Sequence, residues 1–354
     1  MLHLVYTAHG SEADFERIEP DLDGVARQCA RLVLVVEDVL PPALLRQCLD
    51  PSLGSLPSDV LFDSRTPKRN REEFARAYDS AVGRLELGYQ AWNAVPVPQK
   101  QTIFGEMTPY NRRLFAWAAA HGVEIVRGET SLEAWLAQNA WHLALLGKDA
   151  GVSRGEPATV WAANREEYEL LARAIRLRDA EIHAQLTRLV RVERRGHGVL
   201  YVVGALHSVN QELLVGDLEA VVHERRFFDP FNEPFVAALI EGSFDQQPAA
   251  VREQIETFAF LGNRLRMLAR PTTSWNDVAQ MLREIERAAL SRSITLRQIV
   301  DHIITAPDFH DAARPHEGFR LRWLVAYAFI THMVNGAFLP RSVAEKHLDF
   351  SPPA

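Results

Sequence analysis

Three side chains capable of metal binding or acid–base chemistry each follow an apolar run of the sequence. His9 comes after LHLVYTA, Glu37 lies near the end of RLVLVVED, and His207 ends GVLYVVGALH. Two imidazoles and a carboxylate are a common ligand set for a divalent ion such as zinc or manganese. Water bound at an open position of such an ion becomes more acidic and can act as a nucleophile. These residue types therefore indicate metal-assisted hydrolysis, provided that they meet in space.

Each of these residues also has an ordinary structural explanation. A single histidine at the end of a strand is more often a surface or hydrogen-bonded residue than a ligand. The carboxylate of Glu37 is more informative, because burying a charge at the end of an apolar strand is costly without a partner. Ligands in α/β sheets gather at the carboxyl ends of the strands. His9, Glu37 and His207 would thus form one site only if their strands are neighbours and parallel.

The elements that would position them are short strands alternating with helices. Four apolar runs without polar alternation are predicted as strands covered on both faces: 2–8, 31–38, 122–128 and 198–207. Three segments between them have the apolar spacing of helices: 11–30, 110–121 and 165–193. This alternation predicts an α/β fold with a mixed, largely parallel sheet flanked by helices.

The chain of 354 residues is long enough for more than one unit. We expect an α/β core over 1–230 and a helical C-terminal region over 231–354. Residues 41–105 contain many prolines and are predicted to form an insertion of short helices and loops.

The C-terminal region is predicted to be a series of helices separated by turns. Helical periodicity is found in 251–270, 275–290, 295–304 and 319–334. Ser274 and Asn276 are predicted to cap the second of these helices. Residues 308–319 contain proline and glycine and are predicted to form a loop between helices.

Charge and composition argue against several classes of protein. The net charge is −7 and the isoelectric point is near 6.0, which does not favour nucleic acid as a partner. Cys29 and Cys48 lack metal-site spacing and are too few for a disulfide framework, as expected in a reducing compartment. The N-terminus has no signal-peptide pattern, and the apolar stretch 323–339 is predicted to be a buried helix rather than a membrane span. We therefore expect a cytoplasmic protein that does not enter membranes.

The order of the motifs resembles that of the Tiki/TraB superfamily, which includes the ChaN haem-binding proteins and the erythromycin esterases. YTAHGSEADF is similar to the first GxxH motif of that superfamily, and VLYVVGALHSVN contains a complete second motif that ends in His207. LVLVVED resembles the strand that ends in the family glutamate. RLRDAEIHAQLTRLV resembles the helix that carries an Arg-Asp pair, here Arg178-Asp179, and YNRRLFAWAAAHGVEIV resembles the helix–strand unit in the middle of these proteins. The resemblance covers roughly residues 1 to 215.

The resemblance implies that His9, Glu37 and His207 form the polar centre of the site. Arg178 would reach it from its helix, to pair with Glu37 or to hold a substrate anion, since a guanidinium suits bidentate contact with carboxylate or phosphate. Tyr6 stands where the first motif has glycine, so it would narrow the site or supply a phenol. The implied activity is metal-dependent hydrolysis of an amide, ester or lactone bond in a small molecule or peptide.

Two other functions stay open beside the hydrolase. The site can instead hold haem or another small molecule, with Tyr6 and the nearby histidines as axial ligands, as the ChaN resemblance implies. Alternatively the protein is a non-catalytic accessory protein whose C-terminal helices dock a second copy or another protein.

Further candidates lie close to these motifs. Glu12 is one turn past His9 and is either a general base or, as we favour, a favourable charge at a helix N-terminus. Tyr110 precedes the helix before the third strand and is predicted to line the pocket. Ser208 and Asn210 are predicted to cap the helix that follows. The sequence contains no Walker loop and no GxGxxG, HExxH or GxSxG motif, so nucleotide, zincin and serine-hydrolase functions have no support.

Overall fold

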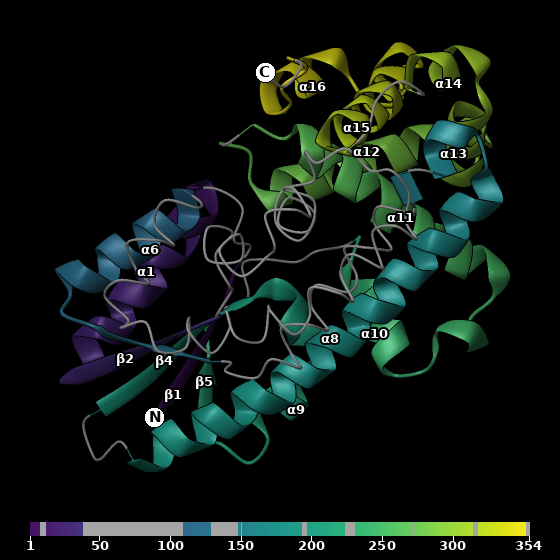
Figure 1. Ribbon diagram of the computed structural model, residues 1–354. Helices are drawn as coiled ribbons and strands as arrows, with labels where there is room; N and C mark the ends of the chain where they lie inside the picture. Colours follow the sequence, from purple (N-terminus) through teal and green to yellow (C-terminus); the bar gives the residue numbers. More distant parts are fainter. Residues whose placement is uncertain are drawn as a thin grey trace, which may run out of the picture.

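The fold combines a parallel β-sheet, helices on both of its faces and a helical C-terminal region (Figure 1), which confirms the predicted α/β class. The computed structural model describes residues 1–7, 12–37, 109–128, 148–149, 151–192, 197–223, 231–270, 272–313 and 318–351. The predicted insertion over 41–105 lies outside these residues.

Five strands form the described sheet, in the order β3-β2-β4-β1-β5. Their bounds are Leu2–Thr7 for β1, Arg31–Val36 for β2, Glu124–Arg127 for β3, His197–Gly204 for β4 and Ala220–Val222 for β5. All pairings between these strands are parallel. Strands β1 to β4 match the four predicted runs. Strand β5 was not predicted, because three residues are too few for an apolar pattern.

Helices cover the two faces of the sheet and bury alternate side chains of its strands. Helices α1 (Glu12–Gln28) and α6 (Pro109–Ala120) pack on the face that carries Val5 of β1. Helices α8 (Pro157–Val192) and α9 (Gln211–Val215) cover the face that carries Leu4 and Tyr6. Successive side chains of a strand point to opposite faces, so apolar runs without alternation are what a sheet covered on both sides requires. Figure 1 shows the two helical layers on either side of the strands.

Helix α8 connects the two halves of the molecule. It has 36 residues and is therefore about 54 Å long. Val160 and Trp161, near its N-terminus, belong to the core of the C-terminal helices. Ile182 and Leu186, near its C-terminus, pack against the sheet. The residues between these two contacts lie where the sheet and the C-terminal region meet.

The C-terminal region is helical, as predicted. Its elements are α10 (Glu233–Ile240), the 3₁₀ helix η3 (Phe244–Gln246), α11 (Ala249–Leu268), α12 (Trp275–Leu290), α13 (Leu296–Thr305), α14 (Pro307–Ala313), α15 (Gly318–Asn335) and α16 (Arg341–His347). Helix α15 contains most of the apolar stretch that was predicted to be a buried helix, and Phe329, Ile330 and Met333 are buried in the core. Among the described residues, no helix is long and apolar enough to cross a membrane.

Two details of this region differ from the sequence-based expectations. Ser274 is the N-cap of α12, as predicted, but Asn276 lies inside the helix rather than at its cap. The segment expected to be a loop from residue 308 begins as helix α14. Phe309 of this helix packs edge-on against Phe329 of α15, and such tertiary packing overrides the local preference for a turn.

The expected division at residue 230 stays a prediction. Helix α8 belongs to the core by sequence order, yet it contacts α10, α11 and α13 of the C-terminal region. The two halves therefore share an extensive boundary along one helix.

Candidate functional site

The carboxyl ends of three neighbouring strands bring the candidate residues to one edge of the sheet. Strand β4 lies between β1 and β2, and all three run parallel. Glu37 follows the last residue of β2, and His207 lies in the short 3₁₀ helix η2 (Ala205–Asn210) that follows β4. His9 comes two residues after the end of β1 and falls outside the described residues. The structure thus places Glu37 and His207 together, as the sequence pattern predicted.

Glu37 is held at both of its carboxylate oxygens. Its Oε2 accepts a hydrogen bond from Nη2 of Arg178 at 2.8 Å. Its Oε1 accepts one from the backbone N–H of Gly204 at 2.9 Å. The Glu37 side chain is 16% exposed and that of Arg178 is 8% exposed. A carboxylate held in this way is fixed in position, and its charge is balanced by the guanidinium.

His207 lies between two carboxylates. Its Nδ1 is hydrogen bonded to Oδ1 of Asp179, and its Nε2 lies 3.7 Å from Oε1 of Glu37. Asp179 is completely buried and His207 nearly so. Oδ2 of Asp179 accepts a second hydrogen bond from Nδ2 of Asn210 at 3.0 Å. With an ionised Asp179, the Nδ1 atom carries a proton, so in the neutral ring Nε2 is free to accept one.

The charges around His207 raise its pKa. Burial alone lowers the pKa, because it disfavours the charged imidazolium. The charge of Asp179, its hydrogen bond to the ring and the charge of Glu37 act in the opposite direction and outweigh burial, while Arg178 lowers the pKa slightly. The imidazolium form of His207 is therefore stabilised where it is buried.

Asp179 was recognised in the sequence only as part of a family-like pair, and its partnership with His207 was missed. A signal for it does exist. Asp179 stands on the same helical stripe as Ile175, Ile182 and Leu186, all of which are buried. An acidic residue on an apolar stripe requires a partner, because an unpaired buried carboxylate is costly. The adjacent Arg178 points to Glu37 instead, so this single turn of α8 contributes to both sides of the site.

Asn210 also differs from the sequence-based expectation. It occupies the N-cap position of α9, as predicted, but its side chain makes no capping hydrogen bond. The amide donates to Asp179 instead. It therefore helps to hold the partner of His207 in place.

The tyrosines predicted to contact substrate are both buried. Tyr6 is 3% exposed, and its hydroxyl donates a hydrogen bond to Oε1 of Gln211 at 2.8 Å. Tyr110 is fully buried. Burial raises the pKa of Tyr110, with smaller contributions from the charges of Glu37 and Asp14, and hydrogen bonding to Thr7 acts in the opposite direction. Both side chains are thus buried near the strand ends, and their contact with substrate stays a prediction.

Glu12 is the first residue of α1 and is exposed. An acidic residue in the first turn of a helix interacts favourably with the helix dipole. This position agrees with the role that we favoured for Glu12.

The described donors suit a divalent metal only in part. Nε2 of His207 and Oε1 of Glu37 are close enough to share an ion after a small adjustment. Among the described residues, however, no group of three or more His, Cys, Asp or Glu side chains could hold a metal ion. The third predicted ligand, His9, lies outside those residues.

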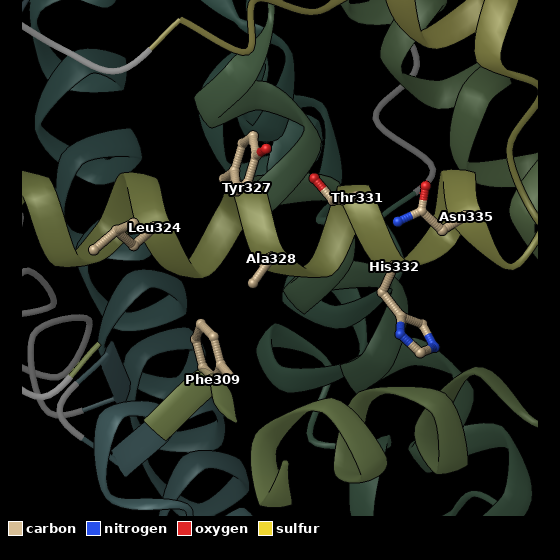
Figure 2. Close-up of a pocket in the computed structure, with 7 residues that line it drawn as sticks. All are labelled: Phe309, Leu324, Tyr327, Ala328, Thr331, His332 and Asn335. Atoms are coloured by element: carbon tan, nitrogen blue, oxygen red, sulfur yellow. The ribbon is translucent and has the colours of Figure 1, made fainter. Parts of the chain in front are cut away.

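Two hollows lie away from these side chains. The first has a volume of about 380 Å³ and is lined by residues of α14 and α15. Figure 2 shows Phe309 of α14 on the side of α15 toward which Ala328 points, with Tyr327 on the other side of that helix. The second has a volume of about 500 Å³ and lies along α8. Neither is lined by His207 or Glu37.

Comparisons with protein-family models, with curated proteins and with solved structures find no match for this chain. The function is therefore argued from the site itself.

Proposed function

We propose that the protein is a hydrolase related to the Tiki/TraB superfamily, in which the Asp179–His207 pair activates water for attack on an ester, lactone or amide bond. The observation that carries this proposal is the buried hydrogen bond between Asp179 and Nδ1 of His207, with Nε2 of the same ring turned toward Glu37. A histidine oriented by a carboxylate is the usual arrangement of a general base.

His207 performs the proton transfer in this proposal. Nε2 takes a proton from water as the oxygen attacks the carbonyl carbon, and the imidazolium later returns that proton to the leaving group. Asp179 keeps Nδ1 protonated and stabilises the positive ring. General base catalysis of this kind contributes about 10²- to 10⁴-fold to the rate.

Glu37 and Arg178 organise the charge next to the base. The Glu37 carboxylate lies 3.7 Å from Nε2, where it can accept a hydrogen bond from the attacking water. Arg178 and the N–H of Gly204 hold this carboxylate in place. Because Arg178 and Glu37 neutralise each other, the proton on His207 is balanced mainly by Asp179.

A divalent ion would define an alternative scheme, because an ion bound at Nε2 of His207 leaves that nitrogen unable to accept a proton. Held by His207, Glu37 and the expected third ligand His9, it would lower the pKa of a bound water molecule. The roles of Asp179 as the partner of His207 and of Arg178 as the partner of Glu37 are the same with or without it.

The test is hydrolysis of a panel of aryl esters, lactones and peptide amides by the purified protein. We expect turnover of at least one bond class, reduced by about 10²- to 10⁴-fold in His207→Gln. His302→Gln is the matched control, because His302 is exposed on α13. Unchanged turnover in His207→Gln would refute the proposal. Metal content and activity are both measured before and after chelation. Loss of activity together with the metal supports the metal-assisted scheme, and activity retained without metal supports the metal-free one.

The haem-binding and accessory functions stay predictions. The hydroxyl of Tyr6 is already hydrogen bonded to Gln211, which makes Tyr6 a poorer axial ligand than the sequence implied. A cytoplasmic location, a small-molecule or peptide substrate, and docking through the C-terminal helices likewise remain expectations that accompany the proposed hydrolase.

A further inference from the structure

We infer that the hollow along α8 is a binding site for a small amphipathic anion, namely a carboxylate on an apolar chain. This inference is independent of the proposed hydrolysis. The hollow has a volume of about 500 Å³, within the range of small-molecule sites. Three elements line it: α8, α9 and α10. Helices α9 and α10 each pack against α8, and Figure 1 shows both along it.

Part of the lining of the hollow is basic. Arg173 and Arg176 line it and are exposed. Their spacing of three residues places them on the same side of α8. Among the described residues, neither guanidinium has an ion pair or a hydrogen bond from its side chain. The chain as a whole is acidic, with a net charge of −7. Two neighbouring arginines without counter-ions form a local positive charge that attracts an anion.

The acidic residue of the lining, Glu169, is paired with a third arginine. Oε1 of Glu169 accepts a hydrogen bond from Nε of Arg165 at 2.8 Å. Arg165 in turn contacts both carboxylate oxygens of Asp245 through Nη2, at 2.8 Å each. Glu169 and Arg165 are thus paired, which leaves Arg173 and Arg176 as the anion-binding groups of the lining.

The rest of the hollow is apolar. Its lining consists of Ala172, Leu177, Ala180, Leu213 and Leu239. Leu213 is 40% exposed, and its cover by an apolar group would be favourable. An apolar chain lying between Leu177, Leu213 and Leu239 would remove this surface from water. A carboxylate beside the two arginines and an apolar chain along the leucines together match the lining.

The test is a fluorescence titration with anilinonaphthalene sulfonate, followed by displacement with decanoate or with the uncharged decanamide. We expect decanoate to displace the dye and decanamide to be about tenfold weaker or worse, since it cannot pair with the arginines. In the double variant Arg173→Gln/Arg176→Gln, decanoate should also bind at least about tenfold more weakly. Circular dichroism checks that each variant is folded.

Three controls locate the site. Arg191→Gln removes an exposed arginine from the last turn of the same helix and should leave decanoate binding unchanged. Ala328→Glu, which blocks the hollow of Figure 2, should also have no effect. His207→Gln should bind decanoate normally, so that failure of the hydrolase proposal and failure of this one are distinguishable.

Several results would overturn the inference. The first is a double arginine variant that binds decanoate as tightly as the wild type does. The second is displacement of the dye by decanamide as effectively as by decanoate, and the third is loss of decanoate binding in Ala328→Glu. Displacement of the dye by a glutamate-rich helical peptide but not by decanoate would show a protein-docking groove instead.

Discussion

At the scale of single residues, the charge of Asp179 determines the pH at which His207 can act as a base. The pKa of His207 is raised although burial lowers it, because Asp179 and Glu37 favour the imidazolium. In Asp179→Asn the largest of these favourable contributions is lost, so the pKa of His207 should fall. The acidic limb of the pH–rate profile should then move to lower pH, while the maximal rate drops by about 10²-fold or more because the ring loses its orientation.

The same shift predicts a pH dependence of stability. A pKa raised on folding contributes stability that is fully present below the unfolded value of about 6.5 and is lost as pH rises through the folded pKa. The difference in unfolding free energy between the wild type and His207→Gln should therefore shrink as the solution becomes more alkaline. NMR titration of the His207 ring in the metal-free protein measures the pKa directly. A pKa in Asp179→Asn equal to that of the wild type would contradict this account.

The Arg178–Glu37 pair provides a second prediction. Removing only the guanidinium, in Arg178→Met, leaves a mostly buried carboxylate without the cation that balances its charge, although the N–H of Gly204 still donates to it. We expect a loss of about 1–3 kcal/mol of unfolding free energy. The double variant Arg178→Met/Glu37→Gln should lose less than the sum of the two single variants, because it leaves no unpaired charge. Additive effects in urea denaturation would show that the two groups do not interact.

The sequence predicted which residues come close together when the order and direction of the strands determine it. It did not predict which side chains form hydrogen bonds with one another. Glu37 and His207 follow parallel apolar strands, so their proximity could be expected from the rule that strand ends share one edge. The apolar stripe of α8 indicates that Asp179 is buried and needs a partner, but the sequence does not reveal that this partner is His207. The N–H of Gly204 is a backbone donor, and its use by Glu37 has no sequence signal.

At the scale of elements, the start of α12 illustrates how local sequence determines structure. Ser274 and Asp277 form a capping box in which each side chain bonds the backbone N–H of the other residue. We expect Asp277→Asn to cost about 1 kcal/mol of unfolding free energy at neutral pH.

This cost should depend on pH. Burial raises the pKa of Asp277, but the hydrogen bonds with Ser274 outweigh it, and the pKa lies below the usual 3.8. A depressed pKa contributes stability that is present above the unfolded pKa and is lost as pH falls through the folded value. The advantage of the wild type should thus disappear in strong acid. Asp217→Asn is the control, because Asp217 is exposed in the turn after α9. A loss in Asp277→Asn that is the same at every pH would contradict the role of the charge.

Helices and strands with a long apolar pattern could be predicted from the sequence, whereas elements of only a few residues could not. Helices α8 and α15 have many turns of consistent apolar spacing, and the four longer strands are clearly apolar. Strand β5 has three residues, and its position depends on pairing with β1. Helix α14 has seven residues and owes its form to packing against α15. Short elements are specified by tertiary contacts more than by their own sequence.

At the scale of the whole molecule, the two halves are joined by α8 and by a buried cluster of charges beside it. Nζ of Lys148 pairs with the carboxylate of Glu167 on α8 and donates to Oδ1 of Asn164 at 3.0 Å. Next to them, Nη2 of Arg264 on α11 donates to Oδ1 of Asp149 at 2.7 Å. All five side chains are nearly or fully buried. The cluster therefore connects the residues before α8, α8 itself and the C-terminal helices.

Because this cluster is buried, breaking one pair should destabilise both halves together. Burial lowers the pKa of Lys148, and Glu167 counteracts this effect. Glu167→Gln removes that counteraction and leaves the ammonium without a counter-ion of its own, so we expect a loss of about 3 kcal/mol of unfolding free energy. Lys148→Met/Glu167→Leu replaces the whole pair with apolar groups and should recover most of this loss.

Since α8 is common to both halves, thermal unfolding should remain a single transition in each variant. A single variant as stable as the wild type would show that the pair contributes nothing. Two separated transitions would show instead that the sheet and the C-terminal helices unfold independently despite sharing α8.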